Sequence, residues 1–323
     1  MGFIGKRLLI TAVTLLLVSL LTFLAFSIIP GDPALLVLGT EATEEQIAAL
    51  RVEMGLDRSL PEQYLSWLSN FITGNLGNSS RFRGESIVSM IRERLPVTFT
   101  LAILSLAFII LITGAVVLLS AKKEGGLPDR ILNTFTALNI SLPGFFLGVI
   151  FIWIFGILLR LFVPGAYVDY RENPLAFGAY LVFPALAVAI PNAAIMVKFL
   201  RAQVFLQLKS DYVRTAYSKG CGLGEVFRSH VLKNAVIPAV TLLGMIVGEV
   251  FSGSIVIEQV FTIPGIGRLL IASITSRDYP MVQTLVVYIA FIVVIANTLA
   301  DIAIRIIDPR INDPAAAGKG EPA

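Results

Sequence analysis

The chain has 323 residues, of which 56% are hydrophobic and 15% charged, and its mean hydropathy is +0.83. Soluble domains are about 45–50% apolar and about 25% charged, so these values exclude a soluble globular, disordered or fibrous protein and indicate a bilayer protein. One Cys and one His exclude an intrachain disulfide and a His or Cys metal cluster, and a net charge of +3 gives no support to nucleic-acid binding.

Six stretches are apolar over the roughly 20 residues that a helix needs to cross a bilayer. They are 8–29, 97–120, one within 131–162, 179–197, 236–257 and one within 281–307. The third contains Pro143, and the fourth contains Pro184 and Pro191. We interpret Pro143 and Pro191 as kinks. We therefore predict an all-α integral membrane fold with six transmembrane helices and both termini on one side.

The first stretch follows Lys6 and Arg7, which is also typical of a cleaved signal peptide. The apolar region of a signal peptide is roughly 7–15 residues long. Leu8–Ile29 is longer and ends in Pro-Gly-Asp-Pro without a clear cleavage site. We therefore expect residues 1–29 to form an N-terminal anchor helix.

The segment 30–96 between the first two spans is polar. It predicts a helix beginning near Thr43 and ending at Gly55, a second beginning near Pro61 and ending near Gly74, and a turn-rich loop over 74–87. Without His or Cys and with little room for a core, this segment is a candidate docking surface or lid and not an enzyme domain.

Most of the 25 Lys and Arg residues lie on alternate loops: the N-terminus, the loop after the second span, the connection after the fourth, and the C-terminal end. Cytoplasmic loops carry this excess, so we expect both termini, including the tail 311–323, to be cytoplasmic and the segment 30–96 to be extracytoplasmic. Residues 97–310 then form a five-helix core.

The connection after the fourth span, 198–235, is longer than most loops of a helix bundle. Ser210 or Asp211 is a suitable N-cap for a short helix that stops at Gly220. Gly222 and Gly224 then form a turn, and Glu225 begins a second helix that runs to the membrane at Pro238. The predicted helix–Gly–helix hairpin is a shape that a soluble partner could contact.

The run DYVRTAYSKGCGLGEVFRSHVLKNAVIPAVT (211–241) resembles the cytoplasmic coupling loop of ABC importer permeases of the dipeptide/oligopeptide/nickel subfamily. The sequence 214–216 (Arg-Thr-Ala) stands where the general signature has Glu-Ala-Ala, Gly220 where it has Gly, and Pro238 where it has the later Pro. The departures at Arg214, Thr215 and Lys233 are similar to the peptide-permease subtype. The stretches 29–34, 258–270, 276–283 and 308–312 agree with the same family.

The resemblance implies a type I ABC importer permease fold, forming half of a translocation path for di- or oligopeptides in a bacterial or archaeal inner membrane. The implied partners are a second, paralogous permease, two cytoplasmic ATPases and an extracytoplasmic substrate-binding protein. This chain has no P-loop, so ATP and Mg²⁺ would bind to the ATPases, and we expect neither a catalytic residue nor a cofactor in it.

The ATPase-coupling residues implied by the resemblance are Asp211, Tyr212, Arg214, Thr215, Ala216, Lys219, Gly220 and Pro238. The small residues Ala216 and Gly220 would let the helix seat in a groove of the ATPase. Charge alone instead favours a basic patch that holds the loop at anionic lipid. Lipid attraction does not require Gly and Pro at fixed offsets, which favours the coupling interpretation.

Several residues within the spans are candidates for packing or for the translocation path. Gly144 and Gly148, and Gly244 and Gly248, form two G-x-x-x-G pairs that suit close packing, either within this subunit or against the partner permease. Three acidic residues lie within or beside the spans: Glu249, Glu258 and Asp301. Such groups face water, a partner or a helix end and not lipid. Helix-end solvation explains Glu258 and Asp301 most simply, whereas Glu249 is central.

Three alternative functions stay open. An intramembrane enzyme would need catalytic pairs, and the only His, His230, lies in a loop. A secondary carrier would show half-repeats with broken helices and would need no ATPase-docking loop. A nickel or metal-chelate importer is the alternative within the same family, and the absence of His or Cys ligands from the spans favours peptides.

Overall fold

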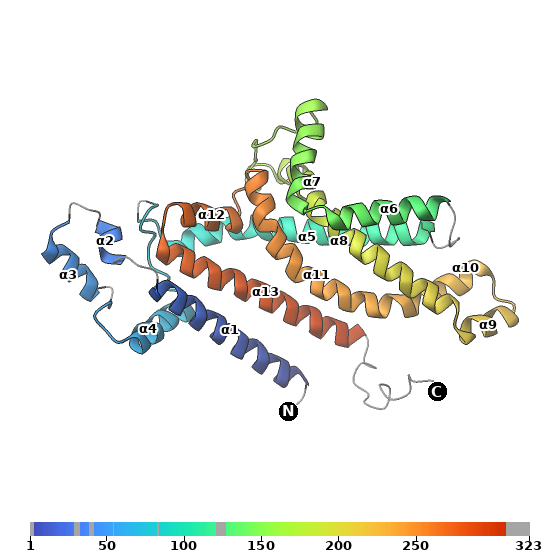
Figure 1. Cartoon of the computed structure of the whole chain (residues 1–323), viewed down its shortest axis with the longest axis horizontal. Coiled ribbons are helices and arrows are strands. Elements are labelled where there is room, and N and C mark those ends of the chain that lie inside the picture. The colour runs from blue at the N-terminus through green and yellow to red at the C-terminus, as the bar shows by residue number, and fades with distance from the viewer. Residues whose placement is uncertain are drawn as a thin grey trace. The chain divides into compact units, whose positions relative to one another are not determined.

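A computed structural model describes residues 3–28, 33–38, 42–53, 55–82, 84–120 and 127–307, and in these ranges every regular element is a helix. In chain order (Figure 1) they are α1 (Phe3–Ile28), α2 (Pro33–Leu38), α3 (Glu44–Glu53), α4 (Leu60–Thr73), α5 (Ile87–Ser120), α6 (Leu127–Ser141), α7 (Gly144–Phe151), η1 (Ile152–Leu158), α8 (Pro174–Leu208), α9 (Asp211–Ser218), α10 (Leu223–Glu225), η2 (Val226–Val231), α11 (Leu232–Val260), α12 (Ile266–Thr275) and α13 (Tyr279–Ile307). The all-α fold is confirmed. The predictions for residues 29–32 and 308–323 lie outside the described ranges.

Five helices are long and apolar enough to cross a membrane: Gly5–Ile28, Ile87–Ser120, Pro174–Leu208, Leu223–Val260 and Tyr279–Ile302. A sixth span is possible if Arg130–Ser141 and Gly144–Leu158 are counted together, although these two helices are bent by 103°. The kink expected at Pro143 is thus a sharp break. Pro143 has extended backbone (φ −61°, ψ 139°) as the N-cap of α7, because it cannot donate a helical hydrogen bond and disfavours helix in the residue before it.

Helices α5 and α8 extend furthest beyond their predicted spans. Helix α5 begins at Ile87 and not at Val97, so the predicted boundary at residue 96 falls inside it. Ile87 and Met90 are buried while Arg92 is exposed, and such an amphipathic turn does not register as an apolar span. Helix α8 runs through Pro184 and Pro191 as one element.

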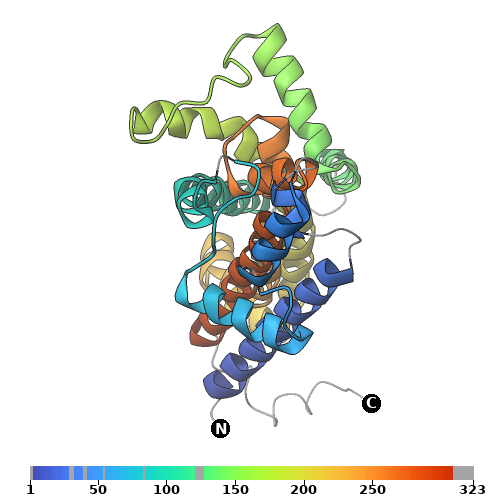
Figure 2. The same cartoon turned by 90° about the vertical axis from the view of Figure 1, so that its left-hand side faces the viewer.

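Contacts divide the chain into two compact units, the first comprising residues 1–99 and 262–295. Its core packs Ile87, Met90, Ile91, Ile266, Leu269, Met281 and Leu285 together. Helix α4 packs on α1 (Figure 2), with the Phe23 ring 5.4 Å from that of Tyr64. Helix α4 ends at Gly74 (φ +78°), and Gly55 (φ +68°) follows α3, so both predicted ends are confirmed.

The second unit comprises residues 100–261 and those from 296 onward. Helices α6, α7 and α11 pack against α8. The buried residues of α8 include Ala185, Ala187, Ala189 and Ala193, whose small side chains allow neighbouring helices to approach closely. Helices α9 and α10 connect the ends of α8 and α11 (Figure 1), so the candidate hairpin projects from this helix pair.

Candidate functional site

Helix α9 presents two different faces. Ser210 is its N-cap, with extended backbone (φ −76°, ψ 150°). Val213 and Ala216, three residues apart, are buried, and α9 packs against η2, where Val226 and Val231 are buried. Residues at i and i+3 share a helix face, so the apolar face holds α9 to the chain and leaves the polar face outward.

Gly220 ends α9 in the way that the sequence predicts. Its backbone has φ +84°, a left-handed conformation that a side chain penalises. The Gly220 N–H donates to Tyr217 O at 2.9 Å, and the Cys221 N–H donates to Ala216 O at 3.2 Å. These two bonds form a Schellman motif, which satisfies carbonyl groups left open at the helix end.

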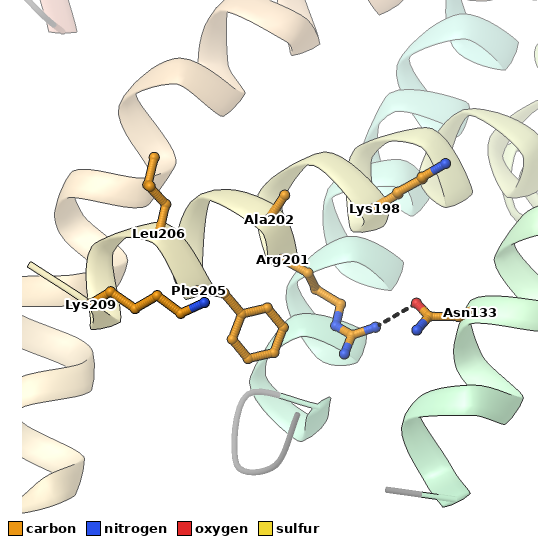
Figure 3. A pocket seen from close by; sticks show the side chains of 7 residues that line it. All are labelled: Asn133, Lys198, Arg201, Ala202, Phe205, Leu206 and Lys209. Carbon is orange, nitrogen blue, oxygen red and sulfur yellow. Dashed lines mark hydrogen bonds between the residues drawn. The ribbon is translucent and has the colours of Figure 1, made fainter. Parts of the chain in front are cut away.

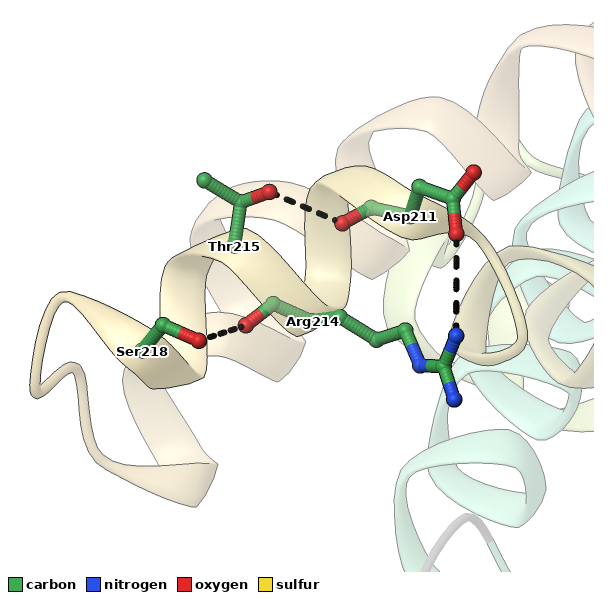
Figure 4. A network of polar contacts seen from close by, with 4 residues as sticks. All are labelled: Asp211, Arg214, Thr215 and Ser218. Atoms are coloured by element: carbon green, nitrogen blue, oxygen red, sulfur yellow. Dashed lines mark hydrogen bonds and ion pairs between the residues drawn. The ribbon is translucent and has the colours of Figure 1, made fainter.

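Four polar residues form the outward face of α9: Asp211, Arg214, Thr215 and Ser218 (Figure 4). The Arg214 and Asp211 side chains are 84% and 99% exposed and pair at 3.9 Å. A surface pair of this kind contributes about 0–1 kcal/mol, so it does little to stabilise the chain. Both charged groups are therefore accessible to a partner.

The remaining predicted coupling residues are not all on this face. Ala216 is only 7% exposed and packs inward, so in this chain it holds α9 in place, and its contact with a partner stays a prediction. Lys219 is exposed beside Gly220, whereas Tyr212 is half-buried and donates from its hydroxyl to Gln207 Oε1 at 2.7 Å. Pro238 lies within α11, two turns after η2, and is half-buried.

The three acidic candidates have different surroundings. Glu258, expected to be solvated at a helix end, is instead fully buried. Asp301 is half-buried on α13. Glu249 is exposed, and it belongs to a stripe along α11 whose other exposed members are Thr241, Met245, Ser252 and Val256.

Three of the four glycines in these pairs lie close to other atoms of this chain. A Cβ at Gly144 would lie 3.3 Å from Ala187 O, one at Gly148 would lie 3.1 Å from the Phe261 ring, and one at Gly248 would lie 2.9 Å from Asn297 Oδ1. Gly244 is half-buried on the same helix as Gly248. These close approaches support the alternative that Gly144, Gly148 and Gly248 pack inside the subunit.

Asp278 is a buried acidic residue of the first unit that was not among the residues predicted from the sequence. Its carboxylate is fully buried and accepts hydrogen bonds from the Ser79 hydroxyl and from the Ser80 hydroxyl at 3.0 Å. Asp278 also precedes α13, where Met281 N donates to its carboxylate at 3.4 Å. The Asp-Tyr-Pro run, with Pro at the second helical position, is a helix-start signal that could have revealed this role.

Known proteins similar to this chain over most of its length are permeases of one transport family. Residues 115–313 match the family described as binding-protein-dependent transport system inner membrane component, and residues 1–102 match the family of the N-terminal part of such membrane components. A probable peptide ABC transporter permease protein of Sinorhizobium fredii is 35% identical over 96% of this chain and 98% of its own length. A putative peptide transport system permease protein of Brucella suis is 35% identical over 92% and 95%. The glutathione transport system permease protein of Pectobacterium atrosepticum is 37% identical over 95% and 97%.

Proposed function

The chain belongs to the family of binding-protein-dependent transport system inner membrane components, and from this premise we propose that it forms half of an ATP-driven path for di- and oligopeptides. As a member it is a multi-pass permease subunit of an ABC importer, and we propose that its partners hydrolyse the ATP. The coupling proposal depends on the two faces of α9: one face is buried against this chain, and the other presents charged residues outward.

The family implies a complex with ATPase and binding-protein partners. We propose two ATPases that bind ATP and Mg²⁺, a second permease and one extracytoplasmic binding protein. In this arrangement both termini and the α9 hairpin are cytoplasmic, as the distribution of Lys and Arg favours. Movement of an ATPase against α9 then reaches the membrane through α8 and α11, which join the hairpin at either end.

Peptides are the proposed substrates because the relatives cited above are described as permeases for peptides and, in one case, glutathione, itself a small peptide. The metal-chelate alternative is not favoured by these relatives. A secondary carrier would not need the binding-protein and ATPase partners that the family implies. An intramembrane enzyme would need a catalytic group, and no relative cited here is described as one.

The proposal predicts ATP-dependent peptide uptake by the assembled transporter. Proteoliposomes that contain this chain, its partner permease and the ATPases should accumulate labelled dipeptide when binding protein and ATP are supplied on their respective sides. A matched preparation without the binding protein should show basal ATP hydrolysis and little uptake. Uptake that persists without ATP and depends on an ion gradient would contradict the proposal and favour a secondary carrier.

Glu249 is the proposed contact for a peptide's amino terminus. An exposed carboxylate near the centre of α11 cannot face lipid cheaply, since a central Asp-type charge costs about 2.5–3.5 kcal/mol on insertion scales. The exposed stripe of α11 around Glu249 therefore faces either an aqueous path or the partner permease. We favour the path, because a protonated amino terminus is the feature that free peptides share and a carboxylate attracts it.

Glu249→Gln keeps the side-chain shape and removes the charge. In the same proteoliposomes we expect the uptake of free-amine peptides to fall about tenfold, as expected for one lost charge-assisted hydrogen bond, and the uptake of N-acetylated peptides to change little. Ser252→Ala, on the same stripe, is the control and should affect neither. Equal loss for both peptides, or dissociation of the complex in detergent, would place Glu249 at the permease interface.

A further inference from the structure

A basic pocket opens between α6 and α8 in the second unit. Its volume is about 450 Å³, and its lining residues are Asn133, Lys198, Arg201, Ala202, Phe205, Leu206 and Lys209 (Figure 3). Three of these side chains are cationic, and within the described part of the chain no carboxylate contributes to the lining. The pocket thus has the charge of an anion-binding site.

Arg201 is held in place within this pocket. The residue is 6% exposed, and its Nη1 donates to Asn133 Oδ1 of α6 at 3.1 Å. The guanidinium also lies over the Phe205 ring, 5.5 Å from its centroid. Lys198 and Lys209 are exposed, and their side chains are flexible. The pocket is therefore lined by one fixed guanidinium and two mobile ammonium groups.

The length of α8 places this pocket at a membrane surface. Its first part, Pro174–Val197, has no charged residue and is about 36 Å long at about 1.5 Å per residue. A bilayer's hydrocarbon core is about 30 Å thick, so the residues from Lys198 onward reach the headgroup layer. With the proposed orientation, this is the cytoplasmic leaflet, where anionic lipids concentrate.

The pocket also has an apolar edge. Leu206 is 62% exposed, Ala202 is exposed, and Phe205 is half-buried. A soluble phosphate would leave these groups in water, whereas a phospholipid places an acyl chain next to its phosphate. We propose that the pocket binds the phosphate group of an anionic phospholipid of the cytoplasmic leaflet, with the chain against Leu206 and the phosphate between Arg201 and Lys209.

This proposal rests on the cytoplasmic placement of α8's end but not on the transported substrate. Bound lipid would bridge α6 and α8 only a few residues before α9 begins at Asp211. It would stabilise the helix that carries the coupling hairpin.

The test uses the whole purified transporter in nanodiscs of phosphatidylcholine with increasing fractions of phosphatidylglycerol. Native mass spectrometry counts the phosphatidylglycerol molecules retained when the complex is released. We expect saturable retention for the wild type. Each lysine near an anionic surface contributes about fivefold in affinity, so the double variant K198Q/K209Q should need about twenty-fivefold more lipid for half-saturation.

The matched control is R130Q/R228Q, which removes two exposed charges of the same unit outside the pocket. It removes charge from the surface and not from the pocket, so it should weaken the retention of phosphatidylglycerol much less than K198Q/K209Q does. Retention by K198Q/K209Q equal to that of the control would overturn the proposal. Displacement of the lipid by excess inorganic phosphate, or phosphate bound to the complex in pure phosphatidylcholine, would overturn the lipid assignment in favour of a soluble phosphate.

Discussion

Gly220→Asp should reduce peptide transport at least tenfold while the chain still inserts in the membrane and assembles. Gly220 has φ +84°, and a side chain in the left-handed region costs roughly 1–2 kcal/mol, less for Asp than for most residues. A Cβ there meets no atom of the described chain within 4 Å, so the further loss has to come from the partner surface. A carboxylate left unpaired at a desolvated interface costs several kcal/mol. ATP hydrolysis stimulated by loaded binding protein is the measurement, and we expect that stimulation to disappear.

Gly222→Asp is the matched control, because it adds the same charge to the same hairpin. Gly222 has φ −71° and open space around its missing Cβ, and it is the N-cap of α10, where Asp is favourable. It should keep most of the stimulation. Equal loss in the two variants would attribute the effect to added charge anywhere on the hairpin and not to a partner contact at Gly220. Wild-type stimulation in Gly220→Asp would mean that the loop is a charged tether with no coupling role.

Asp278→Ala should open the loop at 77–86 and destabilise the first unit. Ser79 donates to Asp278 and accepts from the Phe82 N–H at 2.8 Å, so one carboxylate organises the loop through two serines. Its removal leaves two or three donors without their acceptor, at roughly 1–3 kcal/mol each, and removes a helix cap worth about 1 kcal/mol. We expect a total loss of about 3–5 kcal/mol.

Trypsin cleavage after Arg81, an exposed residue of this loop, measures the opening. When the loop opens and closes faster than it is cut, the cleavage rate follows the open population, so about 3 kcal/mol corresponds to roughly a hundredfold faster cleavage. Glu85→Ala is the control, because Glu85 is an exposed acid of the same loop and its contact with Ser79 N is made by the backbone. Cleavage of Asp278→Ala at the wild-type rate would show that the loop is held by other contacts.

Local features of this protein were predictable where neighbours in the sequence control the energy. The ends of α3 and α4 at Gly55 and Gly74, and the short helix between Ser210 and Gly220, follow from caps and left-handed glycines within a few residues of each other. Apolar length predicted the membrane helices because each span satisfies its own backbone hydrogen bonds. At Pro143 the position of the disruption was predictable, but the 103° angle was not, since neighbouring helices set it.

The helical class, the number of apolar stretches and the position and family pattern of the hairpin could therefore be read from the residues alone. Which side of each helix is covered depends on how the helices pack. Ala216 packs inward, Glu249 stays exposed, and Glu258 is buried because of what lies beside each residue and not because of its type. The bond between Ser79 and Asp278 joins residues 199 positions apart, and Arg201 reaches Asn133 from another helix. Patterns of three or four residues report a helix face, whereas the partner of that face comes from distant segments that only the folded chain brings together.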